Sequence, residues 1–91
     1  MTPSYRFMVT GQVQGVGFRV AAQRQALALG LGGWVRNCAD GAVEGVVAGS
    51  DAQKLSTFKA WLERGPDSAR VDHVDWINAG EAAHETFVVR R

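Results

Sequence analysis

Apolar and other side chains alternate near the amino terminus in the pattern of a half-buried strand. The alternating positions are Tyr5, Phe7 and Val9 on one side and Arg6, Met8 and Thr10 on the other. Since successive side chains of a strand point to opposite faces, this period of two predicts a strand with one face in the core. Gly11 follows directly and is predicted to begin the loop that ends the strand.

Apolar residues then recur at the spacing of a helix. Phe18, Ala22, Ala26 and Leu29 are four, four and three residues apart, which places them along one helical face. Gly30 stands where such a helix would end. The pattern therefore predicts a first helix that begins at the end of a glycine-containing loop and buries one face.

Two β-rich segments in the middle of the chain have the signature of a hairpin. Trp34–Cys38 and Ala42–Ala48 are separated by three residues that include Asp40 and Gly41. An Asp-Gly pair between two strands is a strong hairpin signal, because glycine adopts the backbone angles that tight turns require. The two segments are predicted to pair antiparallel.

A second helix is predicted from its start signal and its apolar stripe. Ser50 and Gln53 have the spacing of a capping box, in which a serine caps the helix and a glutamine three residues later reaches back. Buried positions follow at helical spacing: Leu55, Phe58 and Leu62. This helix is expected to end near Gly65 and Pro66.

The remaining segments complete a recognisable order of elements. Arg70–Ile77 is predicted to be a strand and Glu85–Arg90 a weaker terminal strand, with Ala79 and Gly80 turning the chain between them. The order is β, α, β, β, α, β with a short extra strand. Two right-handed split βαβ units in this order give a ferredoxin-like α+β fold, an antiparallel sheet with both helices on one face. We expect residues 1–91 to form this single domain.

Length and composition limit the cellular context. With 91 residues, of which 46% are hydrophobic and 21% charged, the chain is long enough for one core of two layers. The amino terminus lacks a secretory signal and no segment is long enough to cross a bilayer, so we expect a cytoplasmic protein that does not bind membranes. Cys38 is the only cysteine, which excludes an intrachain disulfide and a cysteine-based metal site. It is expected to be a small buried thiol.

The charged residues are unevenly distributed along the sequence. Residues 1–39 contain four arginines and no acid, for a charge of +4, whereas residues 40–91 carry a charge of −3. Four scattered arginines are too few for a nucleic-acid surface, which is usually strongly basic. We therefore expect the amino-terminal half to attract a small anion, and no nucleic acid.

The segment from Gln14 to Arg19, with the sequence QGVGFR, combines the features that a small anion requires. A loop of small residues before a helix offers backbone N–H groups and the positive end of the helix dipole. Arg19 adds a planar guanidinium, which can pair two phosphate oxygens at once. On this segment alone a glycine-rich turn with a surface arginine is the alternative, since neither a dinucleotide fingerprint nor a nucleotide P-loop is complete.

The segment Gly11–Arg19 (GQVQGVGFR) is followed by Gly33–Asn37 (GWVRN) and, downstream, by Gly41, Val43 and Gly49. Taken together, these residues resemble the signatures of the acylphosphatase family. Two positions depart from the family pattern. Val20 stands where relatives often carry a larger or polar residue, and Ala42 lacks the hydroxyl that many of them have.

The resemblance implies a ferredoxin-like fold and a specific reaction. Members of this family hydrolyse the carboxyl–phosphate bond of acyl phosphates to a carboxylate and inorganic phosphate, with no metal and no cofactor. Carried over by position, Arg19 is the expected phosphate-binding arginine and Asn37 the expected water-orienting asparagine. The expected backbone cradle for the phosphoryl group comprises Gln14, Gly15, Val16, Gly17 and Phe18, together with Arg19. The expected enzyme is a monomer.

The chemistry of an acyl phosphate suits a site without titratable groups. Its leaving group is a carboxylate whose conjugate acid has a pKa of roughly 4, so departure needs no general acid. Stabilising the phosphoryl charge and holding a water in line are then enough. An asparagine amide can hold that water because it has donors and an acceptor. Considered alone, Asn37 would be interpreted as a strand-closing residue with a locally bonded amide.

Other functions are compatible with the predicted fold. A non-catalytic module would bind phosphate or an acyl phosphate in the same loop without turnover. A single-strand RNA binder would need exposed aromatic residues on the central strands, and Ala42–Ala48 contains none. His73 and His84 fall short of the three or four ligands that a zinc site requires, so no metal is expected.

Overall fold

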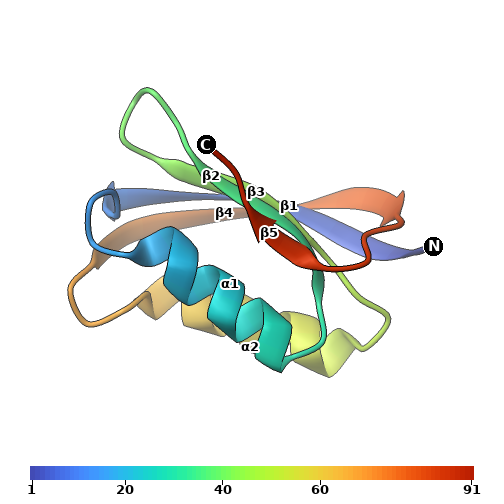
Figure 1. Ribbon diagram of the computed structural model, residues 1–91. Helices are drawn as coiled ribbons and strands as arrows, with labels where there is room; N and C mark the ends of the chain where they lie inside the picture. Colours follow the sequence, from blue (N-terminus) through green and yellow to red (C-terminus); the bar gives the residue numbers. More distant parts are fainter.

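Five strands form one sheet, and both helices pack against the same face of it (Figure 1). The computed structural model describes all residues from Met1 to Arg91. In chain order the elements are β1 (Thr2–Gln12), α1 (Phe18–Ala28), β2 (Gly32–Asn37), β3 (Val43–Ala48), α2 (Ala52–Arg64), β4 (Arg70–Ala82) and β5 (Phe87–Val89). Neither helix combines the length and the apolar content that crossing a bilayer requires.

The strands follow the order β4-β1-β3-β2-β5 across the sheet. The first four pair antiparallel with their neighbours, and the helices connect β1 to β2 and β3 to β4, as predicted for a ferredoxin-like fold. The terminal strand β5 pairs parallel with β2, so the sheet as a whole is mixed. The predicted fold is therefore confirmed, with a parallel edge strand that the alternation pattern did not specify.

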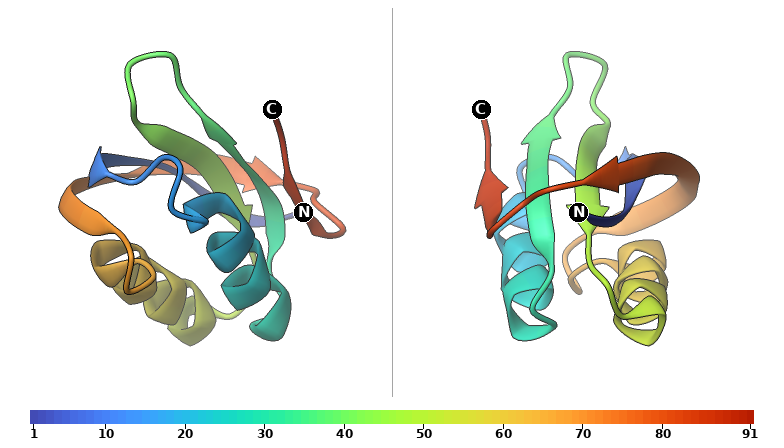
Figure 2. Two further views of the ribbon diagram at one scale, coloured as in Figure 1. Left: turned by 60° about the vertical axis from the view of Figure 1, so that its left-hand side comes forward. Right: turned by 90° about the vertical axis from the view of Figure 1, so that its right-hand side faces the viewer.

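Figure 2 shows both helices on one side of the sheet, and the buried core residues come from these facing elements. The predicted helical stripes are buried except at one position: Phe18, Ala22 and Ala26 on α1, and Leu55, Phe58 and Leu62 on α2. Leu29, the last predicted residue of the first stripe, lies just after α1 and is half-buried. Phe58 lies 5.7 Å from Phe7 and 5.8 Å from Phe87 between ring centroids, so one aromatic side chain of α2 packs against both β1 and β5. Burial of Phe18, the first residue of α1, fixes where this helix begins and thereby positions the loop before it.

The amino-terminal cap of α2 differs from the predicted one. Asp51, not Ser50, is the cap, and its carboxylate accepts from the N–H groups of Gln53 at 2.9 Å and Lys54 at 3.3 Å. A carboxylate accepts both bonds and also interacts favourably with the helix dipole. Ser50 lies one residue before the cap position, and its hydroxyl does not bond the N–H groups of the first turn. The capping-box prediction is therefore wrong by one position.

The strand β4 is longer than the pattern predicts. It does not turn at Ala79 and Gly80 but continues to Ala82, which pairs with Thr2 at the start of β1. The chain turns instead between residues 83 and 86. β1 begins at Thr2, before the alternating residues 5–10. Its first residues offer free backbone groups, with which the end of β4 pairs.

Candidate functional site

Two glycines with left-handed backbone shape the loop between β1 and α1. Gly15 has a φ of 75° and Gly17 a φ of 78°, values that residues with a side chain rarely adopt. Gly17 is also the amino-terminal cap of α1, and no side chain caps this helix end. Turns of this kind direct successive N–H groups toward a shared point, which is the geometry of an anion-binding concavity.

The backbone N–H groups of residues 14–20 form no hydrogen bond within the protein. The first intrahelical bond of α1 runs from the Ala21 N–H to the Gly17 carbonyl at 3.0 Å, and the first turn contains no acid. We call the N–H groups of residues 14–20 the amide cradle. Since unpaired donors and the positive end of a helix dipole both favour negative charge, the amide cradle is suited to an anion.

A cavity of about 100 Å³ lies at the amide cradle. Its lining consists of Val13, Gly15, Gly17, Phe18, Arg19, Val20 and Asn37. The structure thus brings the two predicted catalytic residues together around one space, although they are on α1 and β2. Gln14 and Val16 are the two predicted site residues that do not line it. No lining residue is acidic, so no side chain in the cavity repels an anion.

A larger cavity, of about 290 Å³, lies near the opposite end of β1, where α2 begins. Its lining includes Tyr5, Lys59 and Trp76 but no residue of the β1–α1 loop. Two N–H groups of the adjacent helix end, those of Gln53 and Lys54, are already bonded to the Asp51 carboxylate, which would repel an anion. Size alone therefore does not select the site, and the donor chemistry favours the smaller cavity.

The carboxyl-terminal segment holds Arg19 in place. A guanidinium nitrogen of Arg19 donates to the backbone carbonyl of Arg90 at 2.9 Å, and the Arg90 N–H donates to the Val35 carbonyl at 2.7 Å. One edge of the guanidinium is thereby fixed against the sheet, while its other N–H groups remain available. Nothing in the sequence pattern indicated this contact, because it joins residues 71 positions apart and uses a backbone carbonyl.

The side chain of Asn37 is free of the local bond that a strand-closing asparagine would make. Asn37 is half-buried at the end of β2, and its backbone pairs with Val43. The side-chain hydrogen bonds in the adjacent turn are made by Gln14 and Asp40 and leave the Asn37 amide unbonded. That amide is therefore able to hold a water or a ligand in the cavity that it lines.

Two further side chains anchor the loop itself. The Gln14 amide nitrogen donates to the carbonyls of Cys38 at 2.7 Å and Ala42 at 2.8 Å. The Ser68 hydroxyl donates to the Val16 carbonyl at 2.9 Å. From the sequence, Gln14 was predicted only as part of the backbone cradle and the Ser68 contact was not predicted, since both contacts join segments that are distant in the chain.

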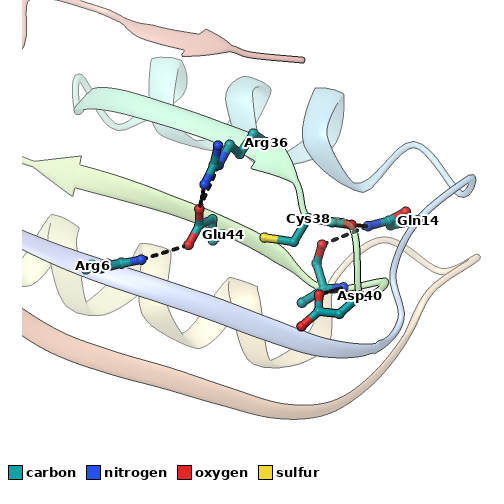
Figure 3. A network of polar contacts seen from close by, with 7 residues as sticks. Arg6, Gln14, Arg36, Cys38, Asp40 and Glu44 are labelled. Atoms are coloured by element: carbon teal, nitrogen blue, oxygen red, sulfur yellow. Dashed lines mark hydrogen bonds and ion pairs between the residues drawn. The ribbon is translucent and has the colours of Figure 1, made fainter.

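Arg6 and Arg36 lie on the face of the sheet away from the helices, where they flank Glu44 (Figure 3). Arg6 donates to one carboxylate oxygen at 3.0 Å and Arg36 to the other at 2.6 Å. These bonds, first that from Arg6, hold the pKa of Glu44 below its ordinary value of 4.5, although burial opposes them. The expectation that the whole amino-terminal half attracts an anion is therefore too broad, since only Arg19 of its four arginines lines the cavity.

Cys38 lies on the same outer face and not in the core, which corrects the expected burial of its thiol (Figure 3). The side chain is half-buried, and desolvation raises the pKa of the thiol, with smaller contributions from the charges of Glu44 and Asp40. A raised pKa keeps the thiol protonated and therefore a poor nucleophile. No group of three or more His, Cys, Asp and Glu side chains is placed to hold a metal ion.

Comparison with known proteins identifies the family of this chain. The acylphosphatase family profile matches residues 5–89. An acylphosphatase of Synechococcus sp. (strain CC9311) is 50% identical over 90 residues, which cover 99% of each chain. The solved structure of an acylphosphatase from Coxiella burnetii has a TM-score of 0.92 at 35% identity, covering 97% of this chain and 92% of that one.

The same fold also occurs inside a longer protein. The solved structure of HypF from T. kodakarensis is similar to this chain with a TM-score of 0.83 and 30% identity. The match covers 98% of this chain but only 12% of that protein. Relatives of this fold are thus found both as chains of equal length and as part of a larger one.

Proposed function

Because the chain belongs to the acylphosphatase family, we propose that it hydrolyses acyl phosphates in the cavity of the β1–α1 loop. The products are a carboxylate and inorganic phosphate. In this proposal Arg19 and the amide cradle bind the phosphoryl group, and Asn37 orients the attacking water. Neither a metal nor another cofactor takes part.

The observation that carries the proposal is the convergence of three kinds of available hydrogen-bond donor on one cavity: backbone amides, a guanidinium and a side-chain amide. Most residues of the amide cradle, among them Arg19, line the space of about 100 Å³ together with Asn37, and no acid lines it. A dianionic phosphoryl group needs such a surrounding, since its equatorial oxygens accept several hydrogen bonds at once. A glycine turn with a merely structural role has no need for all three.

In the proposed reaction the phosphoryl group lies in the amide cradle with Arg19 on its remaining oxygens. The backbone donors are fixed before substrate binds, so no reorganisation is needed when charge spreads over these oxygens in the transition state. The Arg90 carbonyl keeps the guanidinium in one orientation. Arg19 can therefore bind two oxygens in one plane, which a lysine at this position could not do.

The water held by Asn37 attacks phosphorus on the side opposite the acyl oxygen. The new P–O bond forms as the bond to the acyl oxygen breaks, and the carboxylate leaves with that electron pair. Since its conjugate acid has a pKa of roughly 4, the carboxylate departs without being protonated. The proton of the attacking water passes to the phosphate product or to solvent, so no titratable side chain is required.

Replacing Arg19 or Asn37 by alanine should each lower kcat/KM for benzoyl phosphate by about 10²- to 10³-fold, the usual effect of removing one preorganised donor. Arg19→Lys should lose a similar factor, because the charge remains but the planar fork does not. The measurement is simultaneous release of benzoate and phosphate, with a chelator present. Arg24→Ala is the matched control, since Arg24 is exposed on the same helix and does not line the cavity.

Three outcomes of this experiment distinguish the candidates. Turnover that depends on Arg19 and Asn37 but not on Arg24 supports the proposal. Binding of inorganic phosphate without turnover would make the chain a binding module of the same fold. Full activity of a folded Arg19→Ala variant would exclude the proposed site.

The proposal also takes the enzyme to be a monomer in the cytoplasm. A single short domain is compatible with a monomer, and a single unpaired cysteine is compatible with a reducing compartment. Sedimentation at micromolar concentration and fractionation of the producing cells test them, and a dimer or a secreted product would contradict them.

A further inference from the structure

The side chain of Gln14 connects the amide cradle to the turn between β2 and β3 (Figure 3). Its amide nitrogen donates to the carbonyls of Cys38 at 2.7 Å and Ala42 at 2.8 Å. Both partners are carbonyl oxygens, which only accept, so the two N–H groups of the amide are both used. Gln14 is half-buried, which protects these bonds from competing water.

The two accepting carbonyls belong to the part of the chain that carries Asn37. Cys38 is the next residue after Asn37, and its N–H donates to the Ala42 carbonyl at 2.8 Å. The Cys38 carbonyl also accepts from the Gly41 N–H at 3.3 Å. The Gln14 amide therefore closes this turn from outside and fixes it against the loop that forms the cradle.

We propose that Gln14 is a positioning residue, whose side chain sets the place of Asn37 relative to the amide cradle. The inference rests on the proposed function, because it assigns the phosphoryl group to the cradle and the attacking water to Asn37. The Gln14 side chain itself does not line the cavity, so it contacts neither the phosphoryl group nor the attacking water. It acts by holding the β1–α1 loop, which binds the phosphoryl group, against the β2–β3 turn, which follows the water-orienting Asn37.

This role predicts a separation between binding and turnover. The amides of residues 14–20 and the Arg19 guanidinium have their own supports, from the helix α1, the Ser68 hydroxyl and the Arg90 carbonyl. Loss of the Gln14 amide should leave these supports in place and release only the turn. Phosphate should then bind as before, while the water is held less accurately and the chemical step slows.

The test compares Gln14→Met with Gln12→Met. Methionine is nearly isosteric with glutamine and lacks the N–H groups, and Gln12 is an exposed glutamine two residues earlier. For Gln14→Met, kcat on benzoyl phosphate should fall about tenfold, since a misplacement of about 1 Å can cost up to roughly 10²-fold and the displacement expected here is smaller. The inhibition constant of inorganic phosphate should change less than about twofold, and Gln12→Met should match the native chain in both quantities.

A double variant tests whether Gln14 acts through Asn37. In the background of Asn37→Ala, the change Gln14→Met should lower kcat by less than about twofold, because the residue that it positions is gone. A full tenfold loss in that background would overturn the inference. So would a Gln14→Met protein that loses phosphate affinity and kcat equally, or one that loses only thermal stability.

The inference and the proposed function fail in different ways. If the native chain does not turn over benzoyl phosphate, the proposed function is wrong. If the native chain turns over and Gln14→Met is as active, only the inference about Gln14 is wrong. Should Gln14→Met not fold, Gln14→Asn replaces it, since its shorter amide keeps the polarity but cannot reach both carbonyls, and the same split is expected.

Discussion

Glu44 is a carboxylate with only 3% of its surface exposed, on a sheet face that the helices leave uncovered. Its burial is made by Arg6 and Arg36 on the neighbouring strands, which bond to both of its oxygens. A buried carboxylate without these partners would be costly, and with them it cross-links β1, β2 and β3. The two arginines are about half exposed, so solvent screens part of the interaction.

The lowered pKa of Glu44 makes the stability of the protein depend on pH. A carboxyl group whose pKa is lower in the folded state stabilises that state at pH values above its ordinary value of 4.5, and this contribution is lost as pH falls through the folded value. Urea unfolding should therefore show Glu44→Gln to be less stable than the native chain at pH 7. The difference should shrink as pH is lowered below about 4.

The matched control for this prediction is Glu63→Gln. Glu63 is exposed on α2 and takes part in no ion pair. Its substitution should change the free energy of unfolding by less than about 0.5 kcal/mol at either pH. A pH-independent difference between Glu44→Gln and the native chain would show that the arginine bonds are not the source of its effect.

The individual residues of the site differ in how far sequence can predict them. Arg19 and Asn37 were predicted because each belongs to a short signature, and the structure places both on one cavity. The role of the Gln14 side chain, the Ser68 hydroxyl and the Arg90 carbonyl could not be predicted. Their partners lie 24 to 71 residues away in the chain, and only the packed fold brings them together.

Among the secondary-structure elements, α2 allows two candidate capping residues to be compared at its amino-terminal end. Asp51 bonds the N–H groups of Gln53 and Lys54, while Ser50 lies one residue before the cap. Asp51→Ala should cost about 1 kcal/mol, the typical loss for a capping side chain, and lower Tm by roughly 4–8 °C in a domain of this size. Ser50→Ala should cost less than about 0.5 kcal/mol.

Thermal and urea unfolding of the two variants settle which residue caps the helix. Equal losses, or a larger loss in Ser50→Ala, would favour the capping box that the sequence pattern predicted. Because the cap is distant from the β1–α1 loop, both variants should keep the native kcat.

The sequence pattern predicted every helix and strand, but not every residue at which these elements begin and end. The helical stripe of α1 and the hairpin of β2 and β3 were predicted correctly, because a period of four or two reports directly on burial. The extension of β4 to Ala82 and the parallel pairing of β5 were not. Both depend on backbone groups offered by other strands, and backbone groups leave no trace in the side-chain pattern.

At the level of the whole molecule, the end of the chain supports its beginning. The segment after β5 lies against β2 through the Arg90 N–H bond to Val35, and the Arg90 carbonyl accepts from Arg19. The Arg90 side chain contributes a separate contact, with its guanidinium 4.7 Å from the centre of the Trp34 ring. The backbone and the side chain of Arg90 therefore have different functions, which substitution can separate.

Arg90→Pro should lower kcat/KM for benzoyl phosphate by about tenfold. Proline has no N–H to bond Val35, so the carbonyl that orients Arg19 is no longer held, and tenfold corresponds to about 1.4 kcal/mol. Arg90 lies after the last residue of β5, and the substitution removes only the bond to Val35, so the fold should persist. Arg90→Ala keeps the backbone bonds and should stay within about twofold of the native chain, so a loss in Arg90→Ala equal to that in Arg90→Pro would assign the effect to the side chain.

An amide NMR titration of the native chain with inorganic phosphate, in the presence of a chelator, shows which backbone N–H groups bind the phosphoryl group. If acyl phosphates react in the amide cradle, the N–H signals of residues 14–20 should shift together and saturate. The dissociation constant should equal the inhibition constant of phosphate against benzoyl phosphate hydrolysis. Shifts confined to other parts of the molecule, or saturation in a folded Arg19→Ala variant with unchanged affinity, would exclude the amide cradle and Arg19 as the phosphoryl site.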